Sequence, residues 1–270
     1  MKIALQPLAI SSYLRPKKGS MTALHDIKSA LRKVARIGYD GIELATPAAF
    51  GSPEAYKDFL DEIGLEVPTC GGTNYTAMRE SDFADKIREC HILGSRNVMV
   101  SNVDPVVLGN LDELNSFIAA LNRAGRILKD AGIHLSFHNH AIDLARVGGV
   151  TQLQRIVEGT DPEAVYFELD THWLTAGGAH VVSWIRALKG REWIIHFKDY
   201  AIDEYSDTTF LECTHKLFAE VGQGNIHWPG VLEACREAGI AWCAVEQDVC
   251  RRPRFESIAM SHDYLRGLGV

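Results

Sequence analysis

The chain has 270 residues, of which 46% are hydrophobic and 23% charged, and its formal net charge is −7. This length allows one (β/α)8 barrel to form a complete domain with a large core. The negative charge argues against nucleic-acid binding, which needs a basic surface to displace phosphate counterions. The six cysteines are scattered without a Cys-x-x-Cys pair. We therefore expect free thiols, no disulfide framework and a cytoplasmic protein.

The N-terminal segment is interrupted early by Pro7 and has no small-residue cleavage pattern. These features favour a first strand over a signal peptide. No apolar run approaches the roughly 20 residues needed to span a bilayer. We therefore expect no membrane-spanning segment and no membrane partner.

Short β-rich runs alternate with amphipathic stretches eight times along the chain. The predicted strands are 2–9, 40–46, 66–70, 96–101, 133–140, 165–171, 193–199 and 240–248. Predicted helices between them include 23–37, 83–93, 111–128 and 231–238; the first has Ile27, Leu31 and Val34 at helical spacing. Glycines that follow helices and precede strands predict helix C-caps at Gly38, Gly64, Gly94, Gly132 and Gly239.

This alternation, without hairpin turn signals, predicts a parallel sheet. An open doubly wound sheet would usually carry a Gly-rich phosphate loop after its first strand, and residues 9–20 contain none. Eight units in this length fit a closed (β/α)8 TIM barrel better, so we predict an α/β protein with a single domain over residues 1–270. The long connection from Ala201 to Asn225 predicts either a lid or a subunit contact, the latter in a homo-oligomer, and the sequence leaves the oligomeric state open.

Polar side chains gather at the ends of the predicted strands, where barrel active sites lie. They are His138-Asn139-His140, Asp170-Thr171-His172, His196-Phe197-Lys198-Asp199 and Glu246-Gln247-Asp248, with Glu43 in the second strand. Side chains two apart on a strand share a face, so four neighbouring strands each offer a metal-capable residue to the barrel mouth. One such residue alone is usually structural or solvated. Four together predict a site for one divalent ion, with Mn, Zn or Co favoured and Mg as a further candidate.

These residues resemble the xylose isomerase-like barrel superfamily, which holds sugar-phosphate isomerases and epimerases, ketose 3-epimerases, inosose dehydratases and endonuclease IV-type nucleases. The resemblance covers nearly the whole chain, and its motifs are residues 39–43, 137–140, 169–173, 196–199, 221–228 and 245–246. The family holds one metal with Glu, Asp, His and Glu from successive strand ends. The resemblance implies Asp170, His196 and Glu246 as ligands, and it places His138 where the family has its first Glu. His140 is an alternative ligand to His138.

A metal in such a site would act as a Lewis acid on a carbonyl and a neighbouring hydroxyl of a carbohydrate and stabilise an enediolate. We predict that Glu246 removes the proton beside the carbonyl, with His140 as a second acid/base group across the substrate. Lys198 would polarise the carbonyl or hold a substrate oxygen.

Four further residues are predicted to contact the substrate. Glu43 and His172 would bind hydroxyls. Trp173 would cover an apolar sugar face, with core packing as the alternative. Arg251, next to Arg252, would bind the substrate or belong to a solvated rim.

From one enediolate, reprotonation gives an isomerase or epimerase, whereas loss of a β-substituent gives a lyase. Family epimerases exchange the proton between two glutamate ligands, and His138 interrupts that pair. We predict an isomerase or epimerase of a sugar, keto-sugar or sugar phosphate, with a keto-sugar lyase, dehydratase or hydratase as the alternative. A nuclease would need histidines at strand ends 44–46 and 69–71, which have none. The remaining interpretation is a non-catalytic sugar-binding barrel. The predicted acidic and histidine ligands argue against it.

Overall fold

Eight parallel strands form two four-stranded sheets in the computed structural model, which describes residues 1–14, 23–44, 47–101, 107–202 and 216–270. The first sheet has the order β2 (Gly41–Ile42), β1 (Lys2–Leu5), β12 (Trp242–Val245) and β9 (Ile194–Phe197). The second has the order β3 (Gly72–Thr73), β4 (Asn97–Val100), β5 (His134–His138) and β8 (Val165–Glu168). Every neighbouring pair within them is parallel, as predicted.

Backbone contacts link the two sheets on both sides. On one side, parallel bridges join Phe167 to Glu192 and Asp170 to His196. On the other side, Gly41 bridges Glu66, and the Cys70 N–H donates to the carbonyl of Asn97 over 2.9 Å. The strands therefore follow one another in chain order around the molecule, which is the arrangement of a (β/α)8 barrel.

The third predicted strand, 66–70, differs from the structure. The bridge assigned within it is the isolated one at Glu66, although the Cys70 N–H still bonds to Asn97, and the assigned strand β3 begins at Gly72. Pro68 explains the interruption, because a proline has no N–H to donate to a strand ladder.

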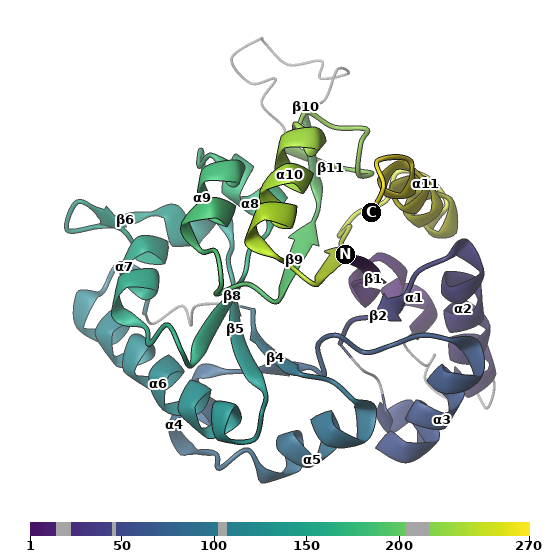
Figure 1. Ribbon diagram of the computed structural model, residues 1–270, viewed down its shortest axis with the longest axis horizontal. Helices are drawn as coiled ribbons and strands as arrows, with labels where there is room; N and C mark the ends of the chain where they lie inside the picture. The colour runs from purple at the N-terminus through teal and green to yellow at the C-terminus, as the bar shows by residue number, and fades with distance from the viewer. Residues whose placement is uncertain (15–22, 45–46, 102–106, 203–215) are drawn as a thin grey trace.

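Helices surround the strands (Figure 1). The longer ones are α2 (Ala23–Ile37), α3 (Pro53–Ile63), α5 (Ala84–Leu93), α6 (Leu111–Asp130), α7 (Gln152–Gly159), α10 (Trp228–Ala238) and α11 (Arg254–Gly267). The shorter ones are α1 (Ser11–Leu14), α4 (Tyr75–Glu80), α8 (Thr171–Ala176) and α9 (Val181–Ala187), with 3-10 turns η1 (Pro7–Ile10), η2 (Pro47–Phe50) and η4 (Ala141–Leu144). The predicted helix 23–37 has the same bounds in the structure, and the C-caps of α3, α5 and α10 are glycines in the left-handed region, as predicted.

Alternation along the strands separates the outer core from the barrel interior. Phe137 packs against Phe117 of α6, and Phe197 against Trp228 of α10, with ring centroids 6.0 and 4.9 Å apart. The residues next to these along each strand, such as His138 and His196, face inward. At the N-terminal end of the barrel the interior is filled by a small apolar cluster of Ala4, Ile194, Trp242 and Ala244. The polar residues described below lie above that cluster.

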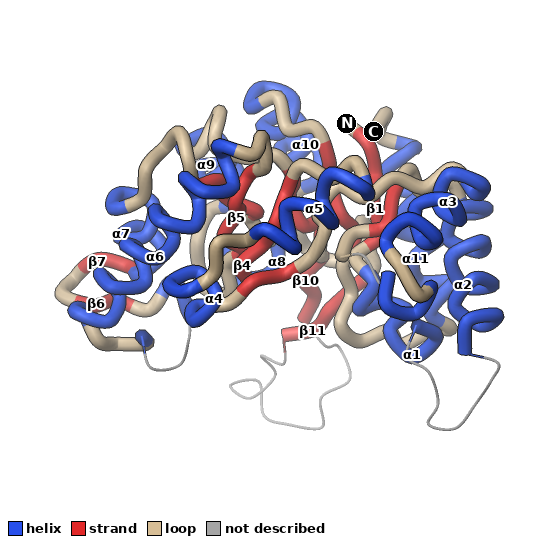
Figure 2. Tube along the Cα trace, turned by 90° about the horizontal axis from the view of Figure 1, so that it is seen from below, coloured by secondary structure: helices blue, strands red, loops and turns tan. Residues whose placement is uncertain are grey.

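Two short hairpins extend from the ends of the strands: β6 (Arg146–Val147) with β7 (Val150–Thr151), and β10 (Asp199–Ile202) with β11 (Lys216–Ala219). Figure 2 shows the β10–β11 hairpin at one end of the molecule and both chain termini at the other. The hairpin belongs to the predicted connection from Ala201 to Asn225. Residues 203–215 of that connection lie outside the described residues, so its role as a lid or subunit contact stays a prediction.

The five described cysteines, Cys70, Cys90, Cys235, Cys243 and Cys250, are free, and Cys213 lies outside the described residues. Free thiols were expected, and the cytoplasmic location inferred from them stays a prediction. Among the described helices, none combines the length and the apolar character that crossing a membrane requires.

Candidate active site

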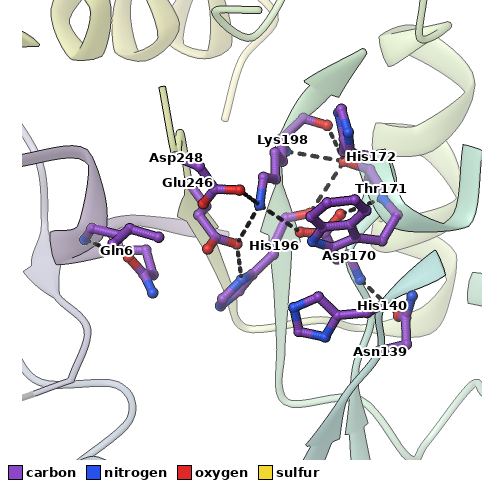
Figure 3. A network of polar contacts seen from close by, with 12 residues as sticks. Gln6, Asn139, His140, Asp170, Thr171, His172, His196, Lys198, Glu246 and Asp248 are labelled. Atoms are coloured by element: carbon purple, nitrogen blue, oxygen red, sulfur yellow. Dashed lines mark hydrogen bonds and ion pairs between the residues drawn. The ribbon is translucent and has the colours of Figure 1, made fainter. Parts of the chain in front are cut away.

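Four side chains from four neighbouring strand ends meet at the barrel mouth. His138, Asp170, His196 and Glu246 are all buried, and each offers a ligand atom within 4.8 Å of the others. The tertiary structure thus brings together the set that strand alternation predicts. Figure 3 shows three of these residues, Asp170, His196 and Glu246, converging with Lys198.

The imidazole of His196 lies between two groups of carboxylates. Its Nδ1 is 2.8 Å from Oε2 of Glu246 at the mouth. Its Nε2 is 2.7 Å from Oε1 of Glu168 and 2.9 Å from Oε2 of Glu43, deeper in the barrel. Burial alone would lower the pKa of His196, but these three carboxylates raise it well above its usual range.

The deeper carboxylates differ in protonation. Burial, reinforced by the neighbouring Glu168, raises the pKa of Glu43 to about 8. Burial also disfavours the charge of Glu168, but contacts with His196 and Glu43 outweigh it and lower the pKa of Glu168 to about 2. The two shifts therefore favour a proton on Glu43 over one on Glu168.

His138 and Asp170 contribute buried polar atoms that have no hydrogen-bond partner among the described residues: Nδ1 of His138 and Oδ2 of Asp170. Burial and the nearby His196 hold the pKa of His138 well below its usual range, so its imidazole is neutral and has a lone pair to donate. Burial raises the pKa of Asp170 to about 8, although Lys198 opposes the shift. Buried donor atoms of these types without partners, on residues that converge on one point, fit a divalent cation.

Lys198 is held at the edge of this cluster. Its Nζ lies 2.7 Å from Oδ2 of Asp248, 3.5 Å from Oε2 of Glu246 and 4.0 Å from Oδ2 of Asp170. The rings of Trp173 and Phe218 lie 4.8 and 4.9 Å from the same nitrogen. Burial would lower the pKa of Lys198, but the three carboxylates raise it, so the side chain is a buried ammonium.

His140 stands at the outer side of the cluster. Its ring is 4.9 Å from that of His138 and 5.4 Å from that of Trp173. Burial, followed by the charge of Lys198, lowers the pKa of His140 to about 4. The neutral imidazole keeps an Nδ1 without a hydrogen-bond partner among the described residues, and that atom is available to accept a proton.

The four predicted substrate contacts occupy different environments. Trp173 is half-buried beside Lys198 and His140, so the structure brings it to the mouth. His172 is buried, with Nδ1 2.8 Å from the carbonyl of Asp199 and its ring against Phe218. Glu43 is buried below His196. The substrate-binding roles of these residues stay predictions.

Arg251 is exposed and lines a rim cavity of about 420 Å³ together with Arg252 and Gln247. Arg252 pairs there with Glu220 over 3.0 Å. The structure therefore does not place Arg251 among the converging side chains, and its role in substrate binding also stays a prediction.

Sequence reasoning missed Glu168 as a member of the site. The signal is a glutamate inside an otherwise apolar buried strand, two residues before Asp170 and hence on the same face. It also missed the part played by Asp248, which lies three residues beyond the end of β12 and contacts Lys198.

Asp199 holds the segment 221–228, which is one of the motifs of the family resemblance. Its carboxylate accepts hydrogen bonds from the backbone N–H groups of Gly222, Gly224 and Ile226 and from the indole N–H of Trp228, at 2.7 to 3.2 Å. A Cβ at Gly224 would lie 2.3 Å from Oδ1 of Asp199, so the close approach requires glycine. The segment is thereby fixed beside β9 and the carbonyl that contacts His172.

The fold and the site define an α/β-barrel with a cation-compatible cluster at the C-terminal ends of its strands. Residues 31–268 match the family described as Xylose isomerase-like TIM barrel, and the chain belongs to it. The predicted fold is therefore confirmed, and the family resemblance with it.

Curated proteins similar to this chain include inosose dehydratases. That of Lacticaseibacillus casei is 23% identical, over 98% of this chain and 96% of its own length. That of Mesomycoplasma hyopneumoniae strain 7448 is 25% identical, over 99% and 96%. The chain is thus an enzyme, and several of its curated relatives carry the name dehydratase.

Solved structures confirm the fold. A sugar phosphate isomerase/epimerase from Parabacteroides distasonis has a TM-score of 0.75 at 23% identity, covering 98% of this chain and 93% of its own. The IOLI protein with a binding zinc atom has a TM-score of 0.70 at 17% identity, covering 100% and 97%. An L-ribulose 3-epimerase has a TM-score of 0.68 at 19% identity, covering 100% and 94%.

Proposed function

We propose that this enzyme is a metal-dependent dehydratase that removes water from a polyhydroxylated cyclic or open-chain ketone of the inosose or keto-sugar type. The observation that carries the proposal is the asymmetry of the cluster. A histidine, His138, stands where the family has one glutamate, and a buried ammonium, Lys198, stands 3.5 Å from the remaining glutamate, Glu246. The names of the curated relatives point to the same reaction.

His138, Asp170, His196 and Glu246 would hold one divalent ion. Two imidazoles and two carboxylates form a mixed nitrogen and oxygen site that suits Mn, Zn or Co, and Mg as a harder alternative. Such an ion supplies Lewis acidity toward a carbonyl oxygen of the substrate. The solved relative with zinc supports the presence of an ion in this fold.

The chain's own groups account for the proton movements of an elimination. Glu246 accepts the proton from the carbon next to the carbonyl, and the electron pair of that C–H bond forms the new double bond. Lys198 donates a proton to the hydroxyl that departs from the adjacent carbon, so the leaving group is water. The 3.5 Å contact between Lys198 and Glu246 then returns the proton from the glutamic acid to the amine.

The surrounding residues orient the substrate and shield the site. The neutral His140 accepts a hydrogen bond from a substrate hydroxyl, or takes a proton in place of Glu246. Trp173 presents an aromatic face at the mouth, which suits the apolar face of a ring of C–H groups. The carboxylate of Asp248 holds Lys198 in position.

An isomerase or epimerase is the second candidate, favoured by the likeness to the two solved isomerase/epimerase structures. In that reaction His140 would return the proton on the face opposite Glu246. The test is incubation of the Mn-loaded protein with an inosose and with ketohexoses in deuterated water, followed by mass spectrometry and ultraviolet absorbance. Loss of one water with growth of an enone band supports the dehydratase. Deuterium incorporation without loss of water supports the epimerase and overturns the main proposal.

A further inference from the structure

Below the metal-capable cluster, polar side chains from adjacent strands cross the barrel interior in one layer. Thr69, Asn97, Ser136 and Glu168 are all fully buried. The amide Nδ2 of Asn97 lies 3.1 Å from Oγ1 of Thr69, 2.8 Å from Oγ of Ser136 and 3.0 Å from Oε2 of Glu168. The hydroxyl of Ser136 donates to the same Oε2 over 2.8 Å. One oxygen of Glu168 is thus fixed by two donors.

The other oxygen of Glu168 faces His196. Oε1 lies 2.7 Å from Nε2, while Nδ1 of the same ring is bonded to Glu246. Glu43 also approaches Nε2, at 2.9 Å, but neither of its oxygens accepts a hydrogen bond from any described residue. Neither of these two contacts with Nε2 has the geometry of a hydrogen bond in the structure. Of these two carboxylates, Glu168 is the one that combines contact with His196 and an anchored second oxygen.

We infer that Glu168 is a positioning residue for His196, and this inference rests on the proposed metal site. By accepting the proton of Nε2, Glu168 places that proton on the inner nitrogen and leaves the lone pair of Nδ1 directed at the cluster. The layer formed by Ser136 and Asn97 holds the carboxylate still. Histidine ligands commonly donate their second N–H to such a carboxylate, and its loss weakens metal binding by about 10- to 100-fold.

The matched pair Glu168→Gln and Glu43→Gln separates this role from a general effect of replacing a buried acidic side chain. Both changes are isosteric, and both replace a side chain that contacts the same nitrogen. We expect Glu168→Gln to weaken Mn²⁺ and Zn²⁺ affinity about 10- to 100-fold and Glu43→Gln by less than about threefold. Affinity is measured by competition with a chelator on the folded proteins, and urea unfolding is measured separately. A merely structural role would lower stability in the Glu168 variant and leave its metal affinity unchanged, which would overturn the inference.

Nuclear magnetic resonance of histidine rings enriched in the heavy nitrogen isotope gives a second readout that does not require activity or metal. We expect a downfield Nε2–H proton of His196 in the wild type and in Glu43→Gln, and its upfield displacement in Glu168→Gln. Equal affinities in the wild type and Glu168→Gln, equal losses in the two variants, or the absence of an Nε2–H proton in the wild type would each overturn the inference. Failure of the wild type to bind any metal would overturn the proposed function, and the position of the ring proton would still decide the role of Glu168.

Discussion

The ammonium of Lys198 lies 2.7 Å from the carboxylate of Asp248, with the rings of Trp173 and Phe218 at 4.8 and 4.9 Å. This enclosure fixes the cation beside Glu246, where the proposed elimination requires an acid. We predict that Lys198→Met lowers kcat on the true substrate by about 10²-fold or more, because the leaving hydroxyl loses its proton donor. Metal content should stay at the wild-type value. The exposed Asp85→Asn serves as a control, and wild-type turnover in Lys198→Met would exclude the lysine as the acid.

Asp248→Asn is expected to lower kcat less than Lys198→Met does, by about tenfold, because Lys198 keeps its contacts with Glu246 and Asp170. The comparison uses steady-state kinetics of the two single variants and of the double variant. If Asp248 acts through Lys198, the double variant should be no slower than Lys198→Met. Additive losses would contradict that coupling.

Metal content tests the composition of the cluster. We expect about one Mn, Zn or Co per chain in the wild type by elemental analysis, and loss of the ion in His138→Ala. His134→Ala is a matched control, since His134 lies on the same strand and its ring packs on Tyr166 away from the cluster. Loss of metal in His140→Ala instead would make His140 the ligand. An absence of metal in the wild type under every loading condition would remove the proposed mechanism.

The variant Glu246→Gln tests whether Glu246 is the general base. A glutamine cannot accept the proton from the carbon beside the carbonyl, so we expect kcat to fall by at least about 10²-fold. The measurement is turnover together with exchange of the substrate C–H proton in deuterated water at saturating Mn. Full turnover in this variant would show that the base assignment is wrong and would move the role to His140.

Asp199→Asn is predicted to destabilise the fold by about 2–4 kcal/mol, because one carboxylate oxygen becomes an amide donor facing N–H groups. Urea unfolding measures the change, with the exposed Asp263→Asn as the reference. The change also loosens the 221–228 segment next to His172, so KM should rise. A loss of stability below about 0.5 kcal/mol would mean that the segment is held by other contacts.

The buried side chain of Glu192 is expected to make the free energy of unfolding depend on pH. Both of its carboxylate oxygens are buried without a hydrogen-bond partner among the described residues, and burial raises its pKa from 4.5 to about 9. Since the folded pKa is above the unfolded one, its contribution is full below pH 4.5 and is lost as pH rises toward about 9. Glu192→Gln removes this loss, so we expect the variant to be more stable than the wild type by about 1 kcal/mol or more near pH 8.

Urea unfolding of wild type and Glu192→Gln across neutral and alkaline pH provides the test. The difference in unfolding free energy should shrink as the pH is lowered, because the wild-type side chain becomes neutral in both states. The exposed Glu233→Gln should show no such trend. A difference that is constant with pH would mean that Glu192 is not neutral in the folded protein.

The sequence alone determined the architecture and which four side chains converge at the barrel mouth. The spacing of Ile27, Leu31 and Val34 was enough for a helix with the observed bounds, because a 3.6-residue period is a local property. The position of His138, Asp170, His196 and Glu246 at successive strand ends was enough for a cluster, because parallel strands in a barrel end at the same rim.

Only the tertiary structure decided depth and orientation. Alternation assigns Glu43 and Glu168 to the interior, but it does not say that both reach Nε2 of His196 while Glu246 takes Nδ1. Nor does it show Lys198 enclosed by Phe218, which comes from a hairpin after the seventh strand. The physical reason is that side-chain period specifies a face, whereas the height of each residue along the barrel and the rotation of each ring depend on the stagger between strands and on packing among residues far apart in the chain.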